Sequence, residues 1–164
     1  MCKTDGIEDF AGRITLKRIT RANVDAILAL KVKPEQENLV ASNAISIAQA
    51  HFNKSAWHRA IYLDNIPIGF VLLVDSSLKF QQLGRKTTSL YIWRLMIDGK
   101  FQGKGYGEKS VELVIDHLKT RPNAKEVTLH HAQTDGNAGR FYDKLGFKLT
   151  GKMLEDEVER KLVL

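Results

Sequence analysis

The stretch from Phe101 to Gly107, FQGKGYG, constrains the fold of this chain more than any other segment. It follows the apolar run YIWRLMI and precedes EKSVELVIDHLK, which predicts a strand before the glycines and an amphipathic helix after them. Glycines at every second position are costly within a folded chain, since glycine loses the most backbone freedom on folding. Because the first N–H groups of a helix lack internal partners, the stretch is either a structural turn or a site for a phosphate-bearing ligand.

Two common nucleotide-binding motifs do not match the spacing of these glycines. A Walker loop requires a glycine five positions before Gly107 and a lysine directly after it, and the chain has neither. A Rossmann fingerprint requires glycine where Glu108 stands and an acidic residue about 20 positions further on, where the chain has Pro122-Asn123. Glycine spacing alone therefore leaves open a turn or a phosphate site of another kind.

The composition is that of one ordinary globular domain. With 164 residues and no repeat or flexible linker, the chain is expected to form a single domain over 1–164, with 1–12 as a loose N-terminal extension. The net charge of +6 is scattered, without a dense basic run or interleaved aromatic residues, which favours a small anionic ligand over nucleic acid. No apolar run is long enough to span a membrane, so no membrane partner is expected.

The cysteine content and the N-terminus predict a cytoplasmic location. The single cysteine, Cys2, has no internal partner for a disulfide, which is typical of a reducing compartment. The start MCKTDGIEDF contains acidic residues and lacks the apolar core of a signal peptide. We therefore expect a protein that is neither exported nor stabilised by disulfides.

Apolar periodicity and turn residues predict an alternation of strands and helices. Strands are expected over 13–19, 89–97, 125–131, 147–150 and 158–164, together with a hairpin over 59–74 that turns at Asp64-Asn65. Helices are expected over 20–30, 34–52, 107–121 and 137–146, and a polar loop over 75–87. This order predicts an α/β (α+β) fold, in which helices cover the faces of a mixed sheet.

Two motifs resemble those of one enzyme family. Gln102-x-x-Gly105-x-Gly107 resembles the acetyl-coenzyme A signature [QR]-x-x-G-x-[GA] of the GCN5-related N-acetyltransferases (GNAT). Downstream, NAGRFYDKLGF resembles the second conserved element of that family, with matching residues at Asn137, Tyr142, Gly146 and Phe147. The resemblance implies a mostly antiparallel sheet of about seven strands, flanked by about four helices and splayed at its central strands. KPEQENLVASNAISIAQA, with IWRLMID, is also similar to the bacterial spermine/spermidine (diamine) acetyltransferases.

The resemblance implies where the cosubstrate acetyl-CoA binds. Its pyrophosphate is expected on the backbone N–H groups of Gln102, Gly103, Lys104, Gly105, Tyr106 and Gly107. The pantetheine arm is expected to pair, as an additional strand, with the main chain of Leu95, Met96 and Ile97. A backbone N–H on that strand would hold the oxyanion of the tetrahedral intermediate, and Asn137 would bind the pantetheine amides.

Tyr142 is the residue for which the resemblance implies a catalytic role. A phenol with a pKa of about 10 can protonate a departing alkyl thiolate, whose conjugate acid has a pKa of about 8.5. Position alone favours the alternative that Tyr142 completes the apolar side of its helix, and the motif favours the general acid.

The acceptor site and its base are less closely defined by the sequence. Glu35 and Glu37 are candidates for holding a polycation, with a solvated helix face as the alternative. Trp93 is a candidate for the wall of the acceptor channel, where it would offer a cation–π face. Asp75 and the turn Glu155-Asp156-Glu157 are weaker candidates for holding the polycation, and they are expected to be ordinary surface. No general base is identified by the sequence.

No metal site is expected. His130 and His131 are neighbours on a predicted strand, so their side chains point to opposite faces and do not share a metal. The other histidines lack ligand partners at useful spacing.

The leading hypothesis is an acetyl-CoA-dependent transfer to a small polyamine or diamine in a ternary complex. The alternatives are the same chemistry on a protein N-terminus, a lysine or an aminoglycoside, and a non-catalytic acyl-CoA-binding sensor. Because homodimers are common in the family, the resemblance leaves a homodimer as an open expectation.

Overall fold

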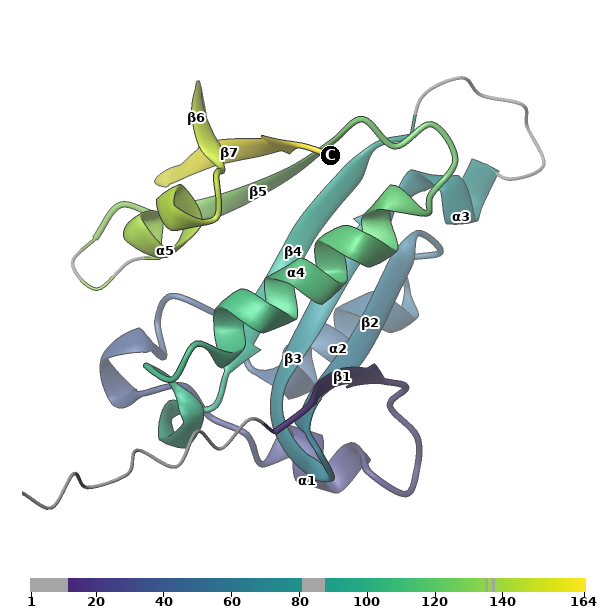
Figure 1. Cartoon of the computed structure of the whole chain (residues 1–164), viewed down its shortest axis with the longest axis vertical. Coiled ribbons are helices and arrows are strands. Elements are labelled where there is room, and N and C mark those ends of the chain that lie inside the picture. Colours follow the sequence, from purple (N-terminus) through teal and green to yellow (C-terminus); the bar gives the residue numbers. More distant parts are fainter. Residues whose placement is uncertain (1–11, 81–87, 135, 137) are drawn as a thin grey trace, which may run out of the picture.

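The computed structural model describes residues 12–80, 88–134, 136 and 138–164, and these form a mixed sheet with helices on both faces (Figure 1). The strands are β1 (Ile14–Lys17), β2 (Ala56–Leu63), β3 (Ile66–Asp75), β4 (Leu90–Ile97), β5 (Glu126–Ala132), β6 (Lys148–Leu154) and β7 (Glu157–Val163). The α-helices are α1 (Val24–Leu28), α2 (Asn43–His51), α3 (Ser76–Phe80), α4 (Tyr106–Lys119) and α5 (Gly139–Lys144). Two short 3-10 helices are η1 (Pro34–Gln36) and η2 (Gly99–Phe101). In the described ranges, every helix is too short or too polar to cross a membrane.

The strand order is β1-β2-β3-β4-β5-β7-β6, and every neighbouring pair is antiparallel except β4 with β5. β4 and β5 pair only at their starts, where Tyr91 lies opposite Thr128 and Ile92 opposite Leu129. Beyond these two positions the strands diverge, as Figure 1 shows. The expected mostly antiparallel sheet with a splay at its centre is confirmed.

Two apolar cores lie on opposite faces of the sheet. On one face, α4 buries Val111, Val114 and Leu118 against strand residues that include Val71 and Leu129. On the other, Ile27 of α1 and Ala50 of α2 pack near Phe70, Leu72 and Met96. Because both faces are covered, successive residues 68–73 of β3 are all buried, which explains the unbroken apolar sequence there.

The structure differs from the expected helices in two places. The segment expected as one helix over 34–52 is divided, since η1 ends at Gln36 and α2 begins only after Ser42. The Ser42 hydroxyl accepts a hydrogen bond from the N–H of Ile45, so this serine caps a new helix, and residues 37–42 are non-helical. In the expected loop 75–87, residues 76–80 form α3, which raises the number of α-helices in the described ranges to five.

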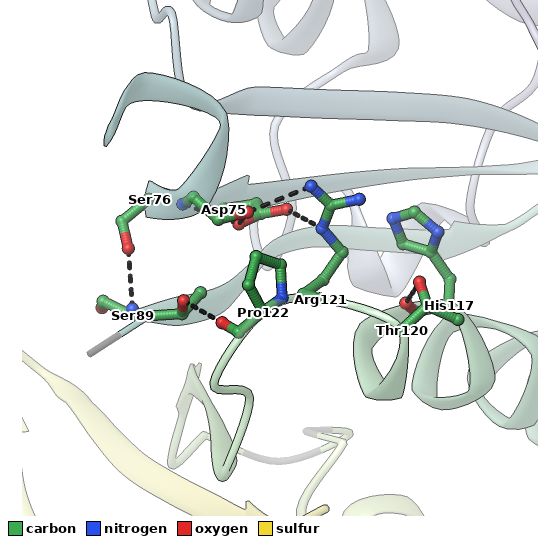
Figure 2. Close-up of polar contacts among 9 residues, drawn as sticks. Asp75, Ser76, Ser89, His117, Thr120, Arg121 and Pro122 are labelled. Atoms are coloured by element: carbon green, nitrogen blue, oxygen red, sulfur yellow. Dashed lines mark hydrogen bonds and ion pairs between the residues drawn. The ribbon is translucent and has the colours of Figure 1, made fainter. Parts of the chain in front are cut away.

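The C-terminal end of α4 is anchored by an ion pair between Arg121 and the buried carboxylate of Asp75 (Figure 2). Asp75, at the end of β3, is 1% exposed, and its Oδ2 lies 2.7 Å from Arg121 Nε. Arg121 also donates to the Ser77 hydroxyl at 3.0 Å, which joins the chain after α4 to the start of α3. The expectation that Asp75 is ordinary surface was therefore wrong, because its partner is 46 positions away in the sequence and is brought to it only by the fold.

Candidate active site

The divergence of β4 and β5 opens a cavity of about 770 Å³. Its walls come from β4, the ends of β5 and α5, the glycine-rich loop 102–107 and the segment 32–41. Both sequence motifs reach it, since Gly103, Gly105 and Gly107 line one part and Ala138, Phe141 and Tyr142 another. A cavity of this size suits a small organic ligand.

The loop 102–107 presents main-chain donors to this cavity. Gly103 and Gly105 have φ angles of +76° and +80°, a left-handed conformation that glycine adopts without strain. Gly105 precedes the first turn of α4, and an added Cβ at either position would have open space around it. Among the described residues, no hydrogen bond uses the backbone N–H groups of residues 103–105. These free donors at a helix N-terminus form an anion-binding arrangement.

The side chain of Gln102 has a positioning role in this loop. Its Nε2 donates to Gln36 Oε1 at 2.7 Å and to the carbonyl oxygen of Ile97 at 2.8 Å. The amide therefore ties the glycine-rich loop to η1 and to the end of β4. This leaves the predicted contact of Gln102 with the pyrophosphate to its backbone N–H.

In the described structure, the end of β4 has one main-chain edge without a strand partner, and the Ile97 carbonyl oxygen at this end accepts a bond from the Gln102 side chain. Leu95, Met96 and Ile97 pair with Val71, Phe70 and Gly69 of β3, and they also line the cavity. No pairing with β5 extends to these positions in the described structure. A linear ligand with amide groups can therefore lie against this edge as an added strand. Asn137, expected to hold the same ligand, lies outside the described residues.

Tyr142 lies on α5 at the cavity wall, and its side chain is 8% exposed. Its ring stacks on His131 with centroids 5.9 Å apart and makes edge contacts with Phe141 and Phe147. Burial raises the pKa of Tyr142, and Tyr91 adds to the shift. The hydroxyl therefore stays protonated at neutral pH. Tyr142 is part of the core and also lines the cavity, so its position is compatible with either sequence-based alternative.

Tyr91 of β4 and His130 of β5 meet on the other face of the sheet, next to the paired positions of the two strands. Tyr91 Oη lies 3.2 Å from His130 Nδ1, and His130 Nε2 lies 3.8 Å from a carboxylate oxygen of Glu159. His130 and Tyr91 line the cavity from this face, whereas neighbouring His131 turns to the opposite face and stacks on Tyr142. Burial, followed by the nearby carboxylates Glu157 and Glu159, raises the pKa of Tyr91.

Sequence reasoning missed this pair of side chains at the cavity. The alternation along β5 was visible and placed His130 and His131 on opposite faces, but the partner on β4 was not. Tyr91 lies 39 positions from His130, and the parallel pairing of Tyr91 with Thr128 brings them together. Within the described ranges, no group of three His, Cys, Asp or Glu side chains is arranged to hold a metal ion.

Of the three residues predicted to bind the acceptor amine, two line the cavity and one does not. Glu37 and Trp93 line the cavity, whereas Glu35 is exposed and is not among the described lining residues. The Arg94 guanidinium lies 5.3 Å from the ring centroid of Trp93, so part of that aromatic face already has a cation. Glu157, expected to be ordinary turn surface, lines the cavity because β7 pairs it with Ala132 of β5.

Comparison with known proteins gives a consistent picture. Among curated proteins, the chain is similar to the spermine/spermidine N(1)-acetyltransferase of Bacillus subtilis strain 168, with 27% identity over 145 residues, covering 85% of this chain and 91% of that protein. Among solved structures, it is similar to an acetyltransferase from Thermus thermophilus, with a TM-score of 0.70, 13% identity and coverage of 92% of this chain and 97% of that one. It is also similar to the aminoglycoside acetyltransferase AAC(6')-Ib in complex with coenzyme A, with a TM-score of 0.69, 14% identity and coverage of 92% and 95%.

The structural similarities support the fold, and the family follows from the sequence. A model of the Acetyltransferase (GNAT) family matches residues 24–147, which is more than half of the chain. The match includes the glycine-rich loop, the splayed strands and Tyr142, the elements that surround the cavity. The chain therefore belongs to the acetyltransferase (GNAT) family.

Proposed function

We propose that this protein transfers the acetyl group of acetyl-CoA to a primary amine of a small polyamine or diamine of the spermine or spermidine type. The observation that carries the proposal is the cavity at the splay, which combines free main-chain donors with titratable groups on both faces of the sheet. The polyamine acceptor is supported by the relative at 27% identity, which is named a spermine/spermidine acetyltransferase. The transfer is direct, in a ternary complex, with the proposed acid and base reaching the gap from opposite faces.

In this proposal, the cosubstrate occupies the part of the cavity formed by β4 and the loop 102–107. The pyrophosphate lies on the N–H groups that precede α4, where the helix dipole adds favourable charge. The pantetheine amides pair with the main chain of Leu95 to Ile97. This places the thioester in the gap, where Tyr142 and the Tyr91–His130 pair both line the cavity.

The proposed chemistry assigns one proton transfer to each face of the sheet. On one face, the imidazole of the Tyr91–His130 pair accepts the proton of the substrate ammonium. The neutral amine attacks the thioester carbonyl carbon and a C–N bond forms. The nitrogen of the tetrahedral intermediate then gives its second proton to water, and the C–S bond breaks. On the other face, the Tyr142 hydroxyl donates its proton to the leaving thiolate and is reprotonated from solvent.

The acceptor is tested by measuring thiol release from acetyl-CoA with a panel of amines. Spermidine, spermine and a diamine represent the proposed class, and a peptide with a free N-terminus, free lysine and an aminoglycoside represent the alternatives. Highest kcat/KM with the polyamines supports the proposal, and preference for another amine overturns the acceptor class. Binding of acetyl-CoA without thiol release with any amine favours a non-catalytic sensor.

The acid is tested by Tyr142→Phe, which removes the hydroxyl and keeps the ring contacts in the core. Loss of a general acid is expected to lower kcat by about 100-fold, while the Kd for acetyl-CoA changes little. Equal kcat in the variant and the parent enzyme would show that the thiolate leaves without Tyr142.

A further inference from the structure

Arg160, on β7, is a buried cation that the proposed reaction does not use. It is 6% exposed and is not among the described residues that line the cavity. Burying a guanidinium is unfavourable unless its N–H groups find partners, since the charge loses its hydration. The partners that Arg160 has here therefore indicate what its burial achieves.

Three of those partners surround Tyr142. Arg160 Nε donates to His131 Nε2 at 2.7 Å, and its NH1 donates to the Asp143 carboxylate and to the Phe147 carbonyl oxygen. His131 is the ring on which Tyr142 stacks, and Asp143 is the next residue of α5. The Phe147 N–H donates to the Tyr142 carbonyl oxygen at 3.0 Å, and the two rings are in edge contact. One guanidinium thus binds three neighbours of Tyr142, which lie on β5, within α5 and in the chain that follows α5.

The contact with Arg160 also determines the form of the His131 ring. A guanidinium only donates hydrogen bonds, so His131 Nε2 must carry the lone pair. The proton is then on Nδ1, which lies 2.8 Å from the carbonyl oxygen of Ala132 and donates to it. With both nitrogens bonded, the imidazole is neutral and its plane is set. Tyr142 therefore stacks on a ring that has little freedom to turn.

We propose that Arg160 is a positioning residue that holds the Tyr142 hydroxyl toward the thioester, acting through His131 and α5. This inference rests on the proposed role of Tyr142 as the acid. This role requires the planar guanidinium group, whose N–H donors point in several fixed directions. A single ammonium group does not donate hydrogen bonds to His131, Asp143 and Phe147 together, because these acceptors lie in different directions.

A double-mutant cycle of Arg160→Lys and Tyr142→Phe tests the inference. Arg160→Lys keeps the positive charge and the pairing with Asp143, and it removes the several N–H donors of the guanidinium. We expect it to lower kcat about 10-fold in the parent enzyme with the KM for acetyl-CoA unchanged, and to have no further effect in the Tyr142→Phe background. The same fold-loss in both backgrounds would overturn the inference, because a merely structural role adds independently.

Lys161→Gln is the matched control on the same strand. Lys161 pairs with Glu126 at 3.0 Å, away from the cavity lining, so its loss is expected to change kcat less than twofold. If Arg160→Lys does not fold, Asp143→Asn is used instead, because it weakens the ion pair of Arg160 with an exposed carboxylate. The same non-additivity with Tyr142→Phe is then expected. The two proposals fail differently. Unchanged kcat in Tyr142→Phe alone rejects the acid and with it the positioning, whereas additivity rejects only the positioning.

Discussion

The two halves of the cavity are built in different ways. The half assigned to acetyl-CoA is mostly main chain from one continuous stretch, the end of β4 and the loop 102–107. The half assigned to the amine is made of side chains from separate strands, with Tyr91 on β4, His130 on β5 and Glu157 on β7. A main-chain site needs unusual local conformations, which leave a mark in the sequence as spaced glycines. A side-chain site needs only the right neighbours, and these depend on strand pairing.

The largest effect is expected from His130→Gln, which alters only the amine half. Loss of the proposed base should lower kcat about 100-fold at neutral pH and leave the KM for acetyl-CoA unchanged. Steady-state kinetics with both substrates measure this. His51→Gln on α2 is the matched control, since His51 is exposed and outside the described cavity lining, and it should leave both constants unchanged. A comparable rise in the KM for acetyl-CoA would show that the two halves are not separable.

Gly105→Ala alters only the cosubstrate half. A Cβ there meets no atom within 4 Å, so the cost comes from the positive φ alone, about 1–2 kcal/mol. If the loop relieves that strain by turning its N–H groups away, the Kd for acetyl-CoA should rise about 10-fold, as measured by calorimetry.

Gly107→Ala is the control for this substitution. Gly107 has no positive φ, and its Cβ would lie 3.4 Å from Phe141 and 3.7 Å from Ile97, close to ordinary contact distances. The stability of this variant should therefore change less than that of Gly105→Ala. Equal losses of stability in the two variants would contradict the assignment of the cost to backbone conformation.

A smaller effect is expected from Glu37→Gln in the amine half. Glu37 lines the cavity and is exposed, and ion pairs of this kind contribute up to about 1 kcal/mol, or roughly a fivefold change in the KM for spermidine. Glu35→Gln is the matched control two residues away and should have the smaller effect. An equal change in the KM for spermidine in both variants would show that the effect comes from general surface charge and not from a contact of Glu37 with the amine.

The smallest effect is expected on the free energy of unfolding, and it comes from His117, which lies outside both halves of the described cavity lining. His117 stacks on Trp57 with ring centroids 4.1 Å apart, and burial, followed by Arg121, lowers the pKa of His117 below its usual value of 6.5. The unfolded chain then takes up a proton at a higher pH than the folded one. The histidine contribution to the free energy of unfolding should be complete above pH 6.5 and decline as the pH falls further. Urea denaturation of the parent protein and His117→Gln at several pH values measures this, and identical pH dependence in both would contradict it.

Much of the fold was predictable because it follows from local patterns. The hairpin at Asp64-Asn65, β4, the loop 102–107 and α4 all lie where turn residues and apolar periodicity indicate them. The division of the helix expected over 34–52 was missed because the apolar pattern continues through residues 37–42. In the structure these residues are non-helical, and Ser42 caps a new helix with its bond to Ile45. The pair of Asp75 and Arg121 was missed because the sequence does not show which distant charge faces a carboxylate.

By itself, the sequence determined the fold class, the glycine-rich loop and the helix that carries Tyr142, since these depend on residues close together in the chain. Only the tertiary structure decided which side chains meet at the gap. The pairing of β4 with β5 joins Tyr91 to His130, and the pairing of β5 with β7 sets Arg160 against His131. Backbone conformation is restricted by adjacent residues, whereas a contact between side chains on different strands depends on register, which forms only when the whole sheet assembles.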